Sequence, residues 1–129
     1  MKTDRDVAFL FGAAALCDGL LGIAFLILPR FIFGLLGAAP PSHLGYIQFS
    51  ALVMVVFSIM FAQIAASPRT YRHLVPYGIL LKASFCCVVF GWWLVAGVPF
   101  LWKPLAVADV GFLILFVWAY RMLAEDAAS

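Results

Sequence analysis

The chain has 129 residues, of which 67% are hydrophobic and only 11% are charged, and its formal net charge is +2. Soluble domains average about 45–50% apolar and about 25% charged residues, so this composition excludes an ordinary soluble domain and indicates a membrane protein. The few Lys and Arg residues form no cluster that neutralises several phosphates, which excludes nucleic acid as a partner. About 20 residues cross a hydrocarbon core, so the length suits a single domain of four spans, residues 1–129.

Four apolar runs predict an all-α, integral membrane four-helix bundle. The runs cover residues 7–28, 43–66, 74–96 and 100–123. Pro29 and Arg30 stop the first run, because proline cannot continue a helix and arginine favours the membrane interface. Residues 30–42 are too apolar for free solvent and too few to span, which predicts an interfacial half-turn. Gly97-Val98-Pro99 predicts a tight turn, and the acidic residues 124–129 predict a frayed tail.

Small residues predict a packing face on the first helix. Ala8 and Gly12 stand four positions apart, as do Ala15 and Gly19, and Gly22 lies close by on an overlapping face. Such spacing lets the backbones of neighbouring membrane helices approach closely. We therefore expect this face to turn toward another helix.

The distribution of Lys and Arg predicts the orientation of the bundle. One end collects Lys2, Arg5, Arg69, Arg72 and Arg121, whereas the other end holds only Arg30 and Lys103. Because cytoplasmic segments carry an excess of Lys and Arg, both termini are expected in the cytoplasm.

Three ionisable side chains lie well inside the apolar runs, namely Asp18, Lys82 and Asp109. At a rise of about 1.5 Å per residue, all three fall within about 8 Å of the membrane midplane. One such charge at a helix centre costs roughly 2.5–3.5 kcal/mol, so we expect the three to face inward and meet. One lysine between two carboxylates leaves a negative charge in excess, which requires a protonated Asp or a further donor. Gln48 is the first candidate for that donor, and Ser84, Tyr46 or a trapped water are others.

Several interpretations of this polar group stay open. It binds the polar head of a lipophilic molecule or exchanges protons, or it only fixes the register of the helices. As an enzyme, the protein would use Asp109 and Lys82 as an acid/base pair for isomerisation or reduction of a membrane-soluble substrate. As a transporter, it would use Asp109 or Asp18 as a proton-coupled carboxylate.

The other polar residues predict no metal or nucleotide site. Cys17, Cys86 and Cys87 fall inside apolar runs without metal-ligand spacing. His43 and His73 have no partner at i+3 or i+4, and the chain has no Gly-rich phosphate loop. These residues by themselves name no ligand for the polar group.

Some of these features occur in an order that is shared with a known family. The features are a first span ending in Pro29, an early Gln48 in the second span, the loop SPRTYRHLVPYG leading into Gly78-x-x-x-Lys82, and a fourth span bearing Asp109. In this order they resemble the DoxX-like small bacterial membrane proteins. The resemblance implies a four-helix bundle of the bacterial inner membrane that often accompanies redox enzymes as an accessory protein or subunit. The candidate ligands that go with it are a quinone or a lipid. Its partners would be membrane lipids, other membrane subunits or a second copy of the chain. Gln48, Lys82 and Asp109 match recurring polar positions of that family, whereas Asp18 is outside its pattern.

Overall fold

The chain folds entirely into helices and turns within the part that the computed structural model describes, residues 2–35, 37, 39, 42–98 and 102–128. The elements are α1 (Lys2–Ile27), α2 (Pro29–Leu35), α3 (Gly45–Ala66), the 3-10 turn η1 (Arg72–Leu74), α4 (Val75–Val95) and α5 (Trp102–Ala128). Four helices are long and apolar enough to cross a membrane: α1, α3, α4 together with η1, and α5. The predicted all-α class with four helices of spanning length is confirmed.

The helices differ from the predicted spans mainly at the two ends of the chain. α1 begins at Lys2, ahead of the predicted start at residue 7. α5 continues through Ala128, so the prediction of a frayed tail after residue 123 was wrong. Ala and Glu dominate this tail and are strong helix formers, so they extend a helix that is already nucleated. Residues 99 and 100, where the predicted turn ends and the predicted fourth span begins, lie outside the described residues.

The connection after α1 folds into a helix where a half-turn was expected. Pro29 ends α1 and also begins α2, because its fixed φ and missing N–H suit the first position of a helix. Pro29 and Phe33 are buried, and the Phe33 ring meets the Phe25 ring edge-on with 6.2 Å between centroids. Burial of these apolar side chains holds α2 against the end of α1.

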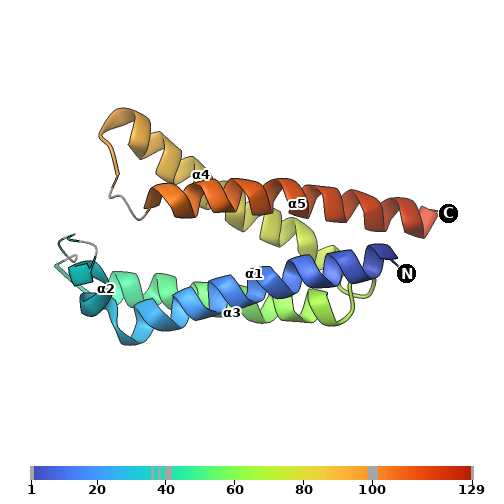
Figure 1. The fold of residues 1–129 in the computed structure, drawn as a ribbon, viewed down its shortest axis with the longest axis horizontal. Helices are drawn as coiled ribbons and strands as arrows, with labels where there is room; N and C mark the ends of the chain where they lie inside the picture. Colours follow the sequence, from blue (N-terminus) through green and yellow to red (C-terminus); the bar gives the residue numbers. More distant parts are fainter. Residues whose placement is uncertain (1, 36, 38, 40–41, 99–101, 129) are drawn as a thin grey trace.

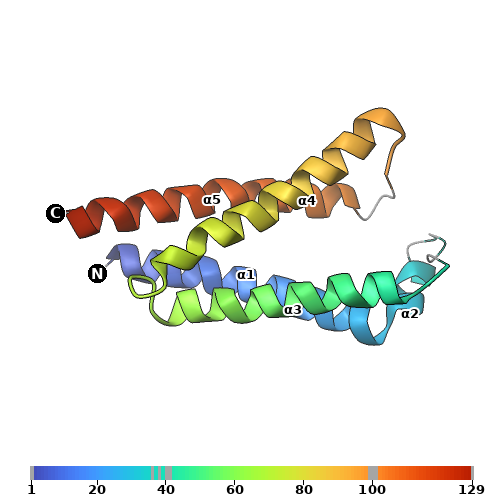
Figure 2. The ribbon, with the colours of Figure 1, turned by 180° about the vertical axis from the view of Figure 1, so that it is seen from behind.

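The four long helices form two pairs, with α1 packed along α3 and α4 packed along α5 (Figures 1 and 2). Both chain termini lie at one end of the molecule, and α2 lies at the other end. The two pairs come together near the termini, whereas the C-terminal half of α4 leans away from α1 and α3. The bundle is therefore closed at the terminal end and wider at the α2 end.

An aromatic core closes the terminal end. The rings of Phe11 and Phe116 stack with centroids 4.5 Å apart, and the Phe61 ring lies 5.3 Å from that of Phe116. All three side chains are fully buried, and such aromatic pairs are worth about 0.5–1.5 kcal/mol beyond their buried area. A Cβ atom on Gly78 of α4 would lie 2.7 Å from the Phe61 ring, so glycine lets α4 join this core.

The small residues of α1 form a close contact along only part of the predicted face. A Cβ atom on Gly22 would lie 2.9 Å from the Ala51 carbonyl oxygen, and one on Gly19 would lie 3.2 Å from the Ser58 Oγ. A Cβ atom on Gly12 would meet no described atom within 4 Å. The prediction of close packing is right for Gly19 and Gly22 and wrong for Gly12, so among these three glycines the two in the C-terminal half of α1 make the close approach to α3.

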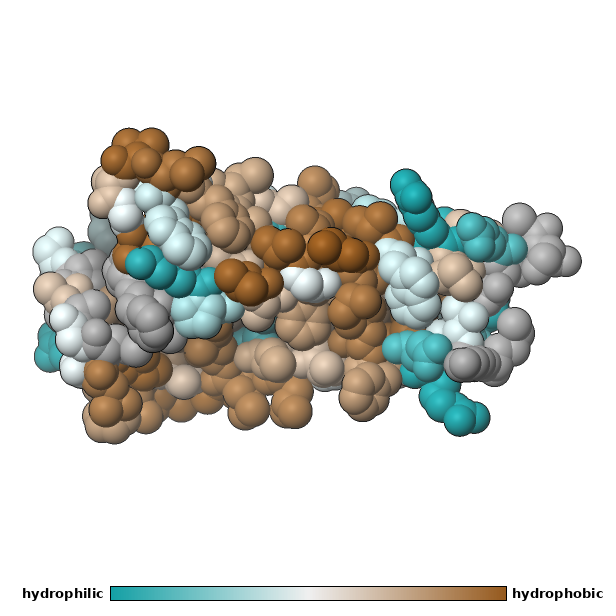
Figure 3. Space-filling model, turned by 45° about the horizontal axis from the view of Figure 1, so that its top comes forward, coloured by the Kyte–Doolittle hydropathy of each residue, from teal (hydrophilic) through white to brown (hydrophobic). Residues whose placement is uncertain are grey.

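The outer surface of the bundle is apolar. Figure 3 shows hydrophobic side chains over most of the visible middle of the molecule, with hydrophilic side chains gathered mainly toward its ends. Phe9 is 80% exposed and Leu94 is 89% exposed, which would be costly for large apolar side chains in water. Helices that are apolar on their outer faces as well as inside suit a lipid surround, so this surface indicates a membrane protein.

Candidate functional site

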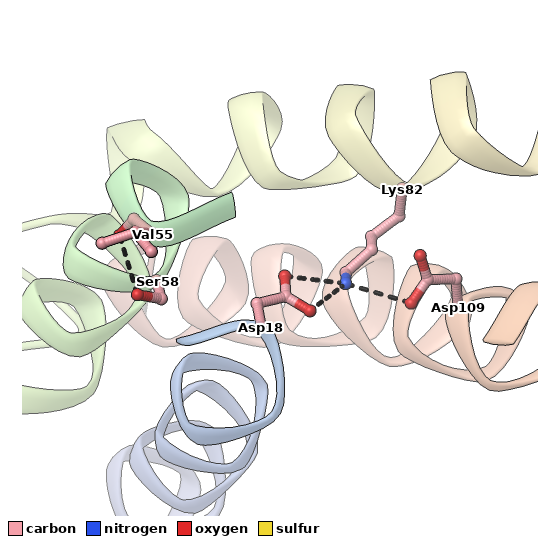
Figure 4. Close-up of polar contacts among 5 residues, drawn as sticks. All are labelled: Asp18, Val55, Ser58, Lys82 and Asp109. Carbon is pink, nitrogen blue, oxygen red and sulfur yellow. Dashed lines mark hydrogen bonds and ion pairs between the residues drawn. The ribbon is translucent and has the colours of Figure 1, made fainter. Parts of the chain in front are cut away.

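Lys82 is the centre of a group of three charged residues, the buried Asp18 and Lys82 and the partly buried Asp109, which we call the ion cluster (Figure 4). The Lys82 Nζ lies 3.1 Å from Oδ1 and 3.0 Å from Oδ2 of Asp18, and 3.1 Å from Oδ1 of Asp109. An ammonium group has three N–H donors, so these three oxygens can accept all of them. Lys82 is only 2% exposed, and its bonds tie α4 to both α1 and α5.

Aromatic rings complete the surroundings of the ammonium group. The Lys82 Nζ lies 5.2 Å from the centroid of the Phe112 ring and 5.9 Å from that of Phe61. At such distances the negative face of an aromatic ring attracts a cation. Because Phe61 also belongs to the aromatic core, the ion cluster lies directly against that core.

The ion cluster joins the two helix pairs of the bundle. Lys82 and Asp109 belong to the α4–α5 pair, and Asp18 reaches them from the α1–α3 pair. Ionised groups in an apolar interior are stable only when they are paired, so each carboxylate is stabilised by its contact with Lys82. The cluster therefore stabilises the contact between the pairs where the aromatic core ends.

A cavity of about 580 Å³ opens beside the ion cluster. All four long helices line it, with the three residues of the ion cluster at one place on its wall and mostly apolar side chains elsewhere. Phe25 and Ile47 line the cavity toward the α2 end, whereas the aromatic core fills the bundle on the opposite side of the cluster. The volume falls within the range of about 300–1,000 Å³ that is common for small-molecule sites. The cavity is thus an apolar space with one charged end.

Asp109 is the member of the ion cluster that is most open. Its side chain is 19% exposed, compared with 10% for Asp18 and 2% for Lys82. Asp109 Oδ1 accepts a hydrogen bond from Lys82, and in Figure 4 no dashed line joins the second oxygen to the Lys82 Nζ. This Oδ2 accepts no hydrogen bond from the residues that the structure describes. The cluster therefore has an acceptor that Lys82 does not use, on a residue that lines the cavity.

Gln48 lies apart from the other predicted site residues. It is exposed on α3 and is not among the described residues that line the cavity. The positions of α3 that face the cavity are Ile47, Ser50, Ala51 and Met54, which recur at the spacing of one helix face. Gln48 is one step of about 100° around the helix from Ile47, so the rotation of α3 turns it away.

Ser50 faces the cavity although the sequence did not single it out. Its hydroxyl donates a hydrogen bond of 3.0 Å to the Tyr46 carbonyl oxygen of its own helix. Serine commonly satisfies itself in this way within a helix, so its presence in an apolar run carries little signal. The other two donors considered from the sequence are also elsewhere: Ser84 bonds to the Leu80 carbonyl oxygen, and Tyr46 is 74% exposed.

The fold and the site define a class, an all-helical membrane protein with a charged group beside an apolar cavity. No three His, Cys, Asp or Glu side chains of the described ranges are grouped so as to hold a metal ion. Searches against protein-family models, curated proteins and solved structures find no match. The ion cluster and the cavity are therefore the structural features that bear on function.

Proposed function

We propose that this protein is an integral membrane protein that binds a lipophilic molecule, such as a lipid or a quinone, in the cavity beside the ion cluster. The observation that carries the proposal is the cavity of about 580 Å³, whose walls are apolar and whose one charged end contains Asp109. Apolar walls with a few polar groups at one place suit a molecule with a hydrocarbon part and a polar head. Intramembrane charged residues are costly to keep, so a role in binding gives a reason for their presence.

In this proposal the four long helices cross the bacterial inner membrane, and both termini are cytoplasmic. The bundle has both termini at one end, as an even number of spans requires (Figure 1). Five Lys and Arg residues belong to segments at that end, against Arg30 and Lys103 at the other. The excess of basic residues supports a cytoplasmic location for the terminal end.

We further propose an accessory role for the protein, as a DoxX-like subunit of a membrane redox complex. The support is the resemblance in the order of its sequence motifs, together with an outer surface that is apolar enough to contact lipid, another subunit or a second copy. The accessory role is a proposal about partner proteins, and ligand binding is a proposal about the cavity. Each has its own test.

The experiment is purification of the full chain in a mild detergent, followed by native mass spectrometry and extraction of bound lipids and quinones. We expect a bound small molecule in the wild-type protein, and co-purifying membrane proteins if it is a subunit. Ala108→Phe fills the cavity and should remove the ligand, because Ala108 lines the cavity wall. Val107→Phe is the matched control, since Val107 is 60% exposed outside the cavity, and it should keep the ligand. A wild-type chain that is alone, empty and monomeric would contradict the proposal.

The open oxygen of Asp109 favours proton-coupled transport as a second candidate function. Asp109 faces a cavity and carries the acceptor that Lys82 leaves unused, so it can take up and release a proton with a substrate. Uptake of substrate into liposomes that needs a proton gradient and disappears in Asp109→Asn would establish transport over binding alone.

The short distance between Asp109 and Lys82 supports a third candidate function, that of a membrane-embedded enzyme. The Lys82 Nζ and Asp109 Oδ1 are 3.1 Å apart, which is within reach for proton transfer between an acid and a base. Isomerisation or reduction of a membrane-soluble substrate that stops in both Asp109→Asn and Lys82→Met would support this candidate.

A further inference from the structure

We infer that the cavity binds an amphiphile whose head group is a hydrogen-bond-donating cation, such as a protonated long-chain amine. The inference rests on the proposed function, because it assumes that the cavity holds a ligand, and it adds the chemistry of that ligand. It also separates the cationic amphiphiles from the quinones, whose carbonyl oxygens only accept hydrogen bonds.

The strong hydrogen-bond donors at the cavity, those of Lys82 and Ser50, are already engaged, and the Cys17 thiol is only a weak donor. Lys82 has three N–H groups, and three carboxylate oxygens of Asp18 and Asp109 lie 3.0–3.1 Å from its Nζ. Ser50 donates its hydroxyl hydrogen to the Tyr46 carbonyl oxygen. An acceptor group, such as a quinone carbonyl or a ligand carboxylate, would have to displace one of these bonds. A ligand head that only accepts is therefore a poor partner for this wall.

The acceptors at the cavity are not all engaged. Asp109 Oδ2 receives no hydrogen bond from the described residues, and the Asp109 side chain is the most exposed of the ion cluster. Neutral groups leave a carboxylate oxygen in an apolar site weakly satisfied, whereas a charged donor gives a short and strong hydrogen bond. An N–H group of a ligand ammonium is therefore a better donor to Asp109 Oδ2 than a neutral hydroxyl is.

The charge of the ion cluster favours the same kind of ligand. With Asp18 and Asp109 both ionised, two carboxylates and one ammonium sum to one negative charge, and within the described ranges no other charged residue lines the cavity. Electrostatic interactions are stronger in such apolar surroundings than in water, so the excess charge attracts a cation and repels an anion. A second ammonium, from the ligand, would make the cluster neutral.

The shape of the cavity places the two parts of such a ligand. The ammonium head would lie against Asp109, where the Phe112 ring already contacts the Lys82 cation. The hydrocarbon chain would extend along the apolar wall toward Phe25 near the α2 end. This orientation follows because the aromatic core fills the bundle on the opposite side of the ion cluster.

The test compares probes that share one hydrocarbon chain and differ in the head group. Tritiated dodecylamine is bound to the immobilised full chain in a mild nonionic detergent and is displaced with dodecylamine, dodecanol, dodecanoate or a decyl-substituted quinone. We expect the amine to bind at least about tenfold more tightly than dodecanol, with dodecanoate the weakest. Asp109→Asn removes the charge with little change in shape and should weaken amine binding about tenfold or more while leaving dodecanol unaffected. Asp4→Asn is the matched control, since Asp4 pairs with Arg69 outside the cavity, and it should keep the wild-type ranking.

The outcomes distinguish this inference from the proposed function. If dodecanol, dodecanoate or the quinone binds as tightly as the amine, and Ala108→Phe blocks that binding, the cavity binds ligands but the inferred head group is wrong. If no probe binds, or if Ala108→Phe does not block the binding of any probe, the inference and the proposed function both fail. Should Asp109→Asn not fold, the wild-type ranking and its retention in Asp109→Glu, which keeps the carboxylate, decide the inference.

Discussion

Replacing Lys82 with methionine should be among the most destabilising single changes in the chain. Methionine keeps the unbranched apolar stem and removes the ammonium group that both carboxylates share. Asp18 and Asp109 would then face one another as buried carboxylates without a cation. Asp18 would be affected most, because both of its oxygens bond to Lys82 and its side chain is only 10% exposed.

The magnitude follows from the contacts of Lys82. Its three hydrogen bonds, at 3.0–3.1 Å, each join charged groups, and such bonds contribute about 1.5–3 kcal/mol each. Their sum is an upper limit, because removal of the charge also removes the cost of burying it. Loss of one partner from a buried ion pair typically costs about 3–5 kcal/mol, which we expect for Lys82→Met. That value is a large fraction of the total stability of about 5–15 kcal/mol that is usual for folded proteins.

The assay is equilibrium unfolding of the full chain in mixed micelles of increasing sodium dodecyl sulfate content, followed by circular dichroism. Lys103→Met is the matched control, because Lys103 contacts the Trp93 ring at 5.2 Å near the end of its span, and it should cost less than about 1 kcal/mol. Adding Asp18→Asn to Lys82→Met should recover part of the lost stability, since one of the two uncompensated charges is then gone.

Two results would refute parts of this reasoning. If Lys82→Met unfolds with the same free energy as the wild type, the ion cluster does not hold the helix pairs together. If Lys82→Met and Asp109→Asn lower stability but leave ligand binding and activity intact, the cluster only fixes the register of the helices, and its charges have no role in binding.

Three further predictions concern the glycine contact between α1 and α3, the cysteine in the cavity, and Gln48. Gly22→Ala should lower the free energy of unfolding by about 1–3 kcal/mol, because its Cβ would lie 2.9 Å from a carbonyl oxygen of α3. Gly12→Ala, measured in the same unfolding assay, should be neutral or stabilising by up to about 1 kcal/mol, and an equal loss in both would contradict the close approach. Cys17 lines the cavity, so bound dodecylamine should slow its alkylation by a maleimide, whereas Cys87 is exposed outside the cavity and should react at an unchanged rate. Gln48→Leu should leave amine affinity unchanged, since Gln48 is exposed and away from the cavity wall, and a loss of about tenfold would place it in the site.

The resemblance to a family and the energetics of burial differ over Asp18. The motif pattern left out Asp18, whereas both the pattern and the charge balance included Gln48. The cost of a lone charge in an apolar run included Asp18, and the structure places both of its carboxylate oxygens on Lys82. Asp18 is thus a charged partner of Lys82 that the motif pattern does not contain.

The sequence by itself determined the all-α class, the four helices and the depth of their charged residues. Uniformly apolar runs of spanning length predict helices, because a helix makes its backbone hydrogen bonds within its own segment, as a lipid surround favours. The rise of about 1.5 Å per residue then converts sequence position into depth. Asp18, Lys82 and Asp109 could be expected at one level for this reason alone.

Only the tertiary structure decided how each helix is rotated and which helices are neighbours. A step of one residue turns a helix by about 100°, so an uncertainty that hardly changes depth moves a side chain to another face. The rotation of α3 turns Gln48 outward and Ser50 inward, and the spread of the two helix pairs creates the cavity. These features depend on non-local contacts, such as the Phe11–Phe116 stack and the approach of Gly22 to α3, which no single apolar run encodes. The sequence placed the charges at one depth, and packing between the helices set Lys82 against both carboxylates and left one oxygen of Asp109 open.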